Sequence, residues 1–223
     1  MRKIGIAPSM MCADFIHLGA ELDLMQEEGA DFLHMDIMDG HYVPNYTLGP
    51  DFCRSLAGYS PLPLDIHLMI ENVDAHVPLF AKIPHARVSF HPEATWHPLR
   101  TIDLIKSFGA QAGIAVDPAL PLAAVREILP HVSMVCIMTV NPGYAGQALI
   151  PEALDKIRAL AEVVRAKGLD IQIEVDGNVS WANIPRMVEA GADLLVAGTS
   201  SLFDGKGDLR SNLRRMRAAI GRE

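Results

Sequence analysis

Four ionisable residues interrupt apolar runs of the sequence. His34 and Asp36 lie two residues apart in "FLHMDIM", His67 lies in "DIHLM", and Asp176 lies in "EVDG". Side chains two residues apart on a strand point to the same face, so we expect His34 and Asp36 to project together. Two neutral imidazoles and two carboxylates suit a borderline divalent ion, such as zinc, iron, manganese or cobalt, better than calcium, which prefers oxygen ligands alone. The sequence therefore predicts one divalent metal ion held by His34, Asp36, His67 and Asp176.

These residues lie in, or in the case of Asp176 directly after, short β-rich runs that alternate with amphipathic helical patterns. The runs cover residues 4–7, 31–37, 64–70, 87–90, 112–116, 134–140, 171–175 and 194–198. Strand and helix taking turns eight times in roughly 200–250 residues is typical of a (β/α)8 barrel, also called a TIM barrel. A doubly wound open sheet is the alternative, but "IAPSMMC" after the first run is not the glycine-rich dinucleotide turn that such a sheet would carry.

Helix boundaries are readable between the runs. Leu18, Leu22 and Met25 recur at helical spacing, and Gly29 is expected to end that helix. No Gly/Ser linker or low-complexity tract divides the chain, so we expect a single barrel domain over residues 1–223.

Chemically unusual residues gather at the C-terminal ends of the predicted strands, the face on which such barrels build active sites. They are Ser9, Asp36, His67, His91, Asn141, Asp176 and Gly198. Methionines at three strand ends, Met38, Met69 and Met138, are placed to form a flexible apolar wall around a reacting carbon. Asp39, one residue out of phase with Asp36, is expected to shape the following loop.

Glycine-containing turns follow the last three predicted strands. They read "NPGYAGQ" (141–147), "DGN" (176–178) and "GTSS" (198–201). Glycines let backbone N–H groups approach an anion closely, so a phosphate can be held here without lysine or arginine. This region is the usual phosphate site of such barrels.

Composition narrows the class of partner. The 223 residues carry a formal net charge of −8, which argues against a nucleic-acid surface because duplex binding relies on clustered cations. The three cysteines form no C-x-x-C pair and are interpreted as reduced thiols of the cytosol. No segment approaches membrane-spanning length. We therefore expect a cytoplasmic protein that binds a small molecule, and neither nucleic acid nor membrane.

The motifs "IAPSMMCADF", "HMDIMDGHYVPN", "DIHLM", "FHPEA", "NPGYAGQ" and "EVDG" together resemble the ribulose-phosphate 3-epimerase family, in the same order and across essentially the whole chain. The resemblance implies a metal-dependent isomerase, in a homo-oligomer, acting on a phosphorylated ketose. It makes Asp36 and Asp176 the acid/base pair as well as metal ligands, and Ser9 a contact to a substrate hydroxyl. Further substrate contacts implied by the resemblance are Met38, Met69, Met138, Gly143, Tyr144, Ala145, Gly146, Gly177, Asn178, Gly198 and Thr199.

Departures from the common family pattern concern substrate length. The family usually has Phe-Gly-Gly-Gln where this chain has Tyr144, Ala145, Gly146 and Gln147, a second glycine at Asn178, and serine at Cys12 and at Thr199. Alanine in this loop, Cys12 and the "GTSSLF" ending resemble the allulose-6-phosphate 3-epimerase branch. The substrate therefore stays open between D-ribulose 5-phosphate, converted to D-xylulose 5-phosphate, and D-allulose 6-phosphate, converted to D-fructose 6-phosphate.

The expected chemistry also follows from the residues. Removing a proton beside a ketone leaves an enediolate, whose charge a divalent ion can stabilise by several kcal/mol. Inverting the carbon needs a base on one face and an acid on the other, each worth about 10²–10⁴-fold. A metal-free barrel decarboxylase would rely on a lysine beside clustered aspartates, which the segment around Asp36 lacks. A non-catalytic sugar-phosphate binding protein would need no opposed carboxylates.

Overall fold

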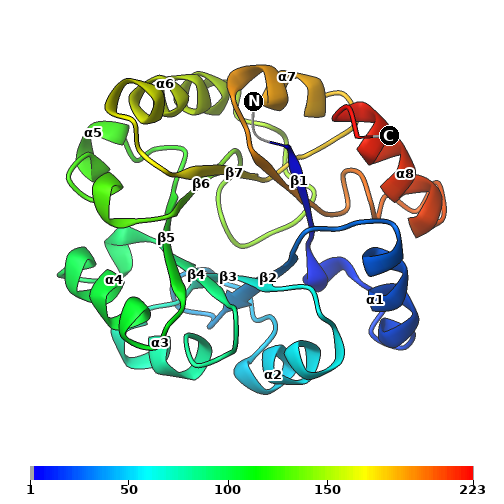
Figure 1. The fold of residues 1–223 in the computed structure, drawn as a ribbon, viewed down its shortest axis with the longest axis horizontal. Coiled ribbons are helices and arrows are strands. Elements are labelled where there is room, and N and C mark those ends of the chain that lie inside the picture. Colours follow the sequence, from blue (N-terminus) through cyan, green and yellow to red (C-terminus); the bar gives the residue numbers. More distant parts are fainter. Residues whose placement is uncertain (1–2, 223) are drawn as a thin grey trace.

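A computed structural model describes residues 3–222 of the chain, in which eight strands form a central ring and helices surround it (Figure 1). The strands are β1 (Gly5–Pro8), β2 (Leu33–Met38), β3 (Leu64–Met69), β4 (Arg87–Phe90), β5 (Gln111–Val116), β6 (Met134–Met138), β7 (Gln172–Asp176) and β8 (Leu194–Ala197). The helices are α1 (Leu18–Glu27), α2 (Pro50–Tyr59), α3 (Val73–Phe80), α4 (Pro98–Ser107), α5 (Leu122–Val125), α6 (Glu152–Lys167), α7 (Ile184–Ala190) and α8 (Leu209–Ala219). Short 3-10 turns cover Met10–Cys12, Pro92–Ala94 and Leu129–His131.

Strand pairing is parallel throughout. Neighbours in the chain pair from β2 to β8, and β8 pairs with β1. A bridge between Ser9 and His34 joins β1 to β2 and completes the ring. Each predicted strand overlaps the observed one, so the predicted (β/α)8 barrel is confirmed.

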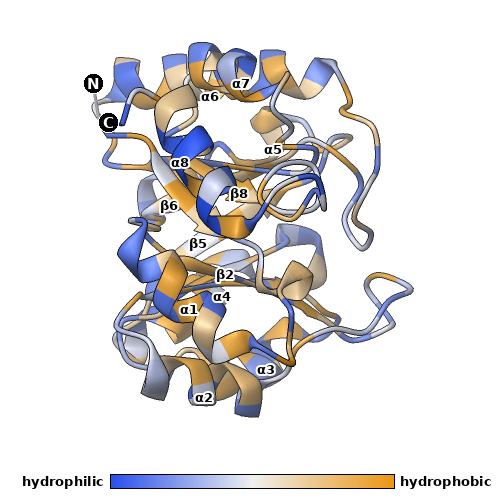
Figure 2. Cartoon of the chain, turned by 90° about the vertical axis from the view of Figure 1, so that its right-hand side faces the viewer, coloured by the Kyte–Doolittle hydropathy of each residue, from blue (hydrophilic) through white to orange (hydrophobic). Residues whose placement is uncertain are grey.

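The core fills the barrel and the layer between strands and helices. Every residue of β2 and β3 is buried, and α1 contributes Leu22 and Met25 to the core. Helix α1 ends at Glu27, and Gly29 follows in the left-handed region at φ 78°, as the sequence predicts. The strands themselves consist largely of apolar residues, whereas α8 is mostly hydrophilic (Figure 2). None of the helices in the described part of the chain is long and apolar enough to cross a bilayer.

Two aspartates tie the starts of neighbouring strands together. Asp31, just before β2, accepts a hydrogen bond from the N–H of Ile6 on β1 at 2.9 Å, and it also pairs with Arg222. Asp193, just before β8, accepts from the N–H of Ile173 on β7, also at 2.9 Å. Each aspartate is preceded by Gly-Ala in the sequence. The tripeptide "GAD" therefore occurs at both of these equivalent contacts between neighbouring strands.

Replacing Asp31 with alanine should therefore loosen the seam between β1 and β2. The N–H of Ile6 and the guanidinium of Arg222 both lose an acceptor, so we expect the free energy of unfolding in urea to fall by roughly 1–3 kcal/mol. Asp155→Ala, which removes a surface pair with Arg158 on α6, is the matched control and should cost under about 1 kcal/mol. Equal losses for the two variants would contradict this role of Asp31.

Candidate active site

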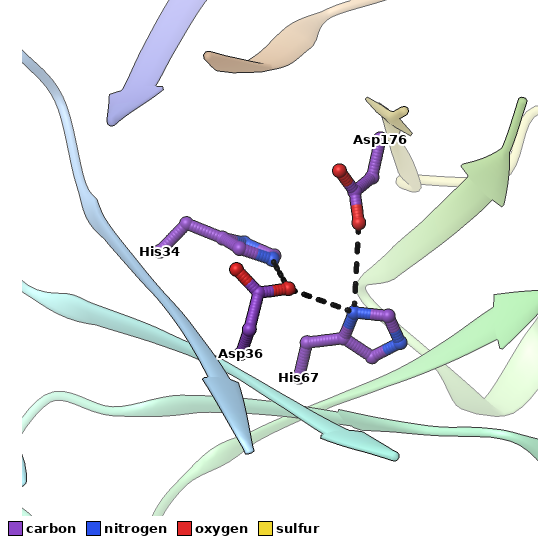
Figure 3. Close-up of side chains that lie close together, drawn as sticks. All are labelled: His34, Asp36, His67 and Asp176. Carbon is purple, nitrogen blue, oxygen red and sulfur yellow. Dashed lines mark ion pairs between the residues drawn. The ribbon is translucent and has the colours of Figure 1, made fainter. Parts of the chain in front are cut away.

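The four predicted metal ligands come together at the C-terminal end of the barrel strands. His34 and Asp36 lie on β2, His67 lies on β3 and Asp176 ends β7, and their side chains point toward one another (Figure 3). One donor atom from each lies within 4.8 Å of the others. Both histidines are fully buried and Asp36 is 5% exposed, so the cluster is almost completely shielded from solvent.

Two ring nitrogens in this cluster have no hydrogen-bond partner among residues 3–222. His34 Nε2 lies 3.4 Å from Asp36 Oδ1, and His67 Nδ1 lies 3.9 Å from the same oxygen and 3.7 Å from Asp176 Oδ2. Buried polar atoms are rarely left without a partner. Imidazole nitrogens beside carboxylate oxygens form a donor set that fits a borderline divalent ion. The residues present therefore fit the metal that the sequence predicts.

The protein environment drives the pKa values of the two carboxyl groups apart. Burial and the nearby Asp36 charge raise the pKa of Asp176 from 3.8 to about 7. Burial also acts on Asp36, but His34, His67 and a hydrogen bond from Ser9 outweigh it and lower the pKa of that carboxyl. The Ser9 hydroxyl donates to Asp36 Oδ2 at 2.6 Å. A metal-free site therefore keeps Asp36 ionised while Asp176 holds a proton up to about neutral pH.

His34 is held from below by a buried polar layer. The pairing of β2 with β3 sets His34 beside Asp65, and His34 Nδ1 lies 2.9 Å from Asp65 Oδ2. Arg87 on β4 contacts Asp65 at 3.6 Å and Glu174 on β7 at 3.5 Å. Burial and the Asp65 charge raise the pKa of Glu174 well above its ordinary value. Burial disfavours a charged His34, but Asp36 and Asp65 outweigh burial and raise the pKa of this histidine.

A pocket opens directly above the cluster, and every substrate contact implied by the sequence lines it. They are Ser9, Met38, Met69, Met138, Gly143, Tyr144, Ala145, Gly146, Gly177, Asn178, Gly198 and Thr199. Further lining residues, for which no role was predicted, include Met11, Val140, Val179 and Val196. In the described part of the chain, no lysine or arginine lines this pocket. The wall is therefore built from methionines, backbone and small side chains, with Asp36 and Asp176 at its base.

The loop from β6 to α6 runs across the barrel mouth in the centre of Figure 1. It is pinned to the loop after β2, because Asn45 Nδ2 donates to the Gly143 carbonyl at 2.9 Å and the Tyr144 hydroxyl donates to the Pro44 carbonyl at 3.0 Å. Asn178, at a usual glycine position of the family, has φ 41°. Asparagine tolerates this left-handed conformation better than most residues, which explains the substitution.

Two further predictions of position can be compared with the structure. Asp39 shapes the loop after β2 as predicted, because its carboxylate accepts hydrogen bonds from the N–H groups of His41, Tyr42 and Glu71. His91 follows β4 at the active end, but it lies behind His67, fully buried, and not among the residues that line the pocket. Asp65 and Glu174 were not predicted as site residues, although each stands two positions before a predicted ligand on the same strand face.

Comparison with known proteins yields one family. Residues 5–203 match the sequence model described as the ribulose-phosphate 3 epimerase family. Ribulose-phosphate 3-epimerase 1 of Cupriavidus necator is 46% identical over 98% of this chain and 93% of its own length. Ribulose-phosphate 3-epimerase of Escherichia coli strain K12 is 42% identical over 100% of this chain and 98% of its own. Ribulose-phosphate 3-epimerase of Bacillus subtilis is also 42% identical, over 97% of this chain and 99% of its own length.

Among solved structures, a mutant tryptophan synthase alpha-subunit from Pyrococcus furiosus covers 99% of this chain and is itself covered completely, with a TM-score of 0.69. Its 14% sequence identity supports the barrel fold alone. The family assignment comes instead from the sequence matches, which extend along almost the whole chain, and the matched residues 5–203 include all six motifs. The chain belongs to the ribulose-phosphate 3-epimerase family.

Proposed function

We propose that this chain epimerises D-ribulose 5-phosphate to D-xylulose 5-phosphate at C3, by two-base proton transfer assisted by one divalent metal ion. Relatives named ribulose-phosphate 3-epimerase at 42–46% identity support the reaction. The single observation that carries the mechanism is the placement of Asp36 and Asp176 at the base of one pocket, on strands separated by β1 and β8 around the ring. The homo-oligomer and the cytoplasmic location stay predictions.

Proton transfer falls to the two carboxylates. Asp36 and Asp176 both reach the pocket base, whereas His34 and His67 are sealed beneath them. One carboxylate takes the C3 proton from one face of the substrate, and the other delivers a proton to the opposite face. Each transfer is worth about 10²–10⁴-fold in rate. The Ser9 hydroxyl, 2.6 Å from Asp36 Oδ2, keeps that carboxylate oriented.

His34, Asp36, His67 and Asp176 would hold the metal ion. When bound, the ion supplies Lewis-acid stabilisation of negative charge on the substrate oxygens, worth several kcal/mol. The His34 Nε2 and His67 Nδ1 atoms support these assignments, because both lie beside carboxylate oxygens and neither has a hydrogen-bond partner in the described residues. Zinc, iron, manganese and cobalt all suit this donor set.

The rest of the pocket binds and shields the sugar phosphate. Turns after β6, β7 and β8 offer backbone groups near Gly146, Gly177 and Gly198 to the phosphate. Met38, Met69 and Met138 are nearly fully buried and place apolar surface beside the base of the pocket. Excluding water there strengthens the electrostatic interactions that the reacting carbon experiences.

Asp176→Asn should stabilise the metal-free protein in a pH-dependent way. The folded-state pKa of about 7 lies above the ordinary 3.8, so the folded protein holds more protons between these values and loses stability as the pH rises through them. Asparagine carries no charge to repel Asp36. In EDTA, the free energy of unfolding in urea should be higher for the variant by roughly 1–4 kcal/mol at about pH 8, and by little at about pH 4.

Added Mn²⁺ supplies the control for that comparison. It should stabilise the wild type more than Asp176→Asn, because the variant has lost a ligand. A gain in EDTA that does not change with pH would contradict the raised pKa.

The assay that tests the proposed function compares substrates directly. With Mn²⁺ present, the chain should convert ribulose 5-phosphate to xylulose 5-phosphate, and EDTA should abolish turnover. Unphosphorylated ribulose should react at least about 100-fold less efficiently, because it lacks the group that the turns bind. His67→Ala should lose both metal and activity.

Allulose 6-phosphate belongs in the same assay, because Cys12 and Ala145 line the pocket. Faster turnover of this six-carbon substrate would replace the proposed substrate but keep the reaction. Turnover of neither sugar by the metal-loaded protein would refute the proposed function.

Two separate bases predict a distinctive isotope pattern. In D2O, deuterium should enter C3 of the product well before it enters C3 of recovered substrate, because each carboxylate exchanges its proton with solvent. Asp176→Asn protein that retains metal should lose epimerisation, while one epimer still exchanges its C3 proton through Asp36. Product that keeps the substrate's own C3 hydrogen would instead indicate one base that serves both faces.

A further inference from the structure

The two ring nitrogens of His67 face different surroundings. Its Nδ1 faces the carboxylates of the cluster and has no hydrogen-bond partner in the part of the chain that the structure describes. Its Nε2 lies 2.9 Å from Nε2 of His91, a hydrogen-bonding distance between two fully buried rings. The ring centroids are 5.0 Å apart. One imidazole therefore lies directly behind another at the base of the pocket.

His91 is itself held on two sides. Its ring packs against Tyr42, with 4.7 Å between centroids, and its Nδ1 lies 2.9 Å from Asp117 Oδ1. This contact is an ion-pair distance, and neither of the two atoms has a hydrogen bond within the described residues. Lys156 fixes the segment that carries Asp117, because its Nζ donates to the Asp117 carbonyl at 2.6 Å. A continuous contact chain thus runs from His67 through His91 to Asp117.

Proton positions along this chain are determined by hydrogen-bond chemistry. A neutral His67 that offers the Nδ1 lone pair to a cation must carry its proton on Nε2. His91 Nε2 must then accept that proton's hydrogen bond, so the proton of a neutral His91 is on Nδ1, where it faces the Asp117 carboxylate. This assignment places a donor opposite an acceptor at both contacts, His67 with His91 and His91 with Asp117.

We propose that His91 and Asp117 are positioning residues that hold His67 in the tautomer and orientation that point Nδ1 toward the metal. The proposal deepens the proposed function and rests on its metal site. In this role neither residue is a metal ligand, because His91 contacts His67 through Nε2 and Asp117 contacts His91. Partners that fix the free N–H of a ligating histidine typically raise metal affinity about 10–100-fold.

The same residues suggest a rival role. His91, Asp117 and the exposed Glu93 could themselves surround a cation, because one donor atom from each lies within 4.8 Å of the others. Such a cation would take the Nδ1 lone pair of His91 and move its proton to Nε2. Two N–H donors would then face each other across the 2.9 Å contact with His67. The positioning role avoids that conflict, so the geometry favours it.

Zn²⁺ affinity of the full chain, measured by competition with a chromophoric chelator, tests the proposal. His91→Leu removes the acceptor behind His67 and should weaken Zn²⁺ binding at least about tenfold. His91→Gln should recover most of that loss, because its amide can accept from His67 and donate to Asp117. Glu93→Gln, the matched control, should bind one Zn²⁺ per chain like the wild type. Thermal unfolding in EDTA verifies that each variant is folded.

Ring ¹⁵N shifts of the histidines in the metal-free wild type provide a second test that needs no metal. His67 should carry its proton on Nε2 and His91 on Nδ1. His67 should lose this preference in His91→Leu.

Three results would overturn the positioning role. They are wild-type Zn²⁺ affinity in a folded His91→Leu, an Nδ1-protonated His67 in the wild type, and a second Zn²⁺ ion that Glu93→Gln loses. A wild type that binds no Zn²⁺ would refute the metal in the proposed function instead, and the ring ¹⁵N shifts would still decide the tautomer.

Discussion

Excess negative charge inside the barrel is the constraint on which the site depends. Asp36, Asp65, Glu174 and Asp176 all project into the interior, where isolated carboxylates are costly. Arg87 is the only buried lysine or arginine in residues 3–222, and its acidic partners there are Asp65 and Glu174. Asp36 and Asp176, the two acids nearer the pocket, therefore have no buried lysine or arginine beside them in residues 3–222. Raised pKa values at Asp176 and at His34 relieve part of this charge, and the cluster geometry suits a divalent ion that would relieve the rest.

The sequence predicted the upper layer of this interior, which holds the four proposed metal ligands. It did not predict the lower layer, which holds Asp65, Arg87 and Glu174. The apolar runs show where each strand ends, and alternation along a strand shows which side chains share a face. These two signals were enough to place Asp36 and His67 at the active end of the barrel. The same alternation places Asp65 two residues before His67, and Glu174 two before Asp176, so a signal for the lower layer was present. Their partners were not predictable, because the alignment of Asp65 with His34 depends on the register between β2 and β3, which neither strand encodes alone.

Glycines in the pocket illustrate a similar limit. The sequence assigned them to close approach of an anion, but packing explains some of them independently. A Cβ at Gly177 would lie 2.6 Å from Val140, and one at Gly143 would lie 2.9 Å from Val43, each at a positive φ. Gly198 differs, because a Cβ there would make only ordinary contacts. Backbone geometry thus accounts for the first two without a ligand, and the space beside Gly198 carries more of the argument for phosphate binding.

The two histidines solve the charge problem in different ways. His34 rests on Asp65, whose charge Arg87 offsets within the barrel. A second carboxylate directly behind His67 would add another charge to an interior that has no further arginine or lysine for it. A neutral imidazole in that place adds no charge. Its other ring nitrogen faces Asp117, whose side chain is 24% exposed. Solvent lowers the cost of the Asp117 charge there. On this argument, the excess negative charge of the interior explains why one ligand is supported by an acid and the other by a histidine.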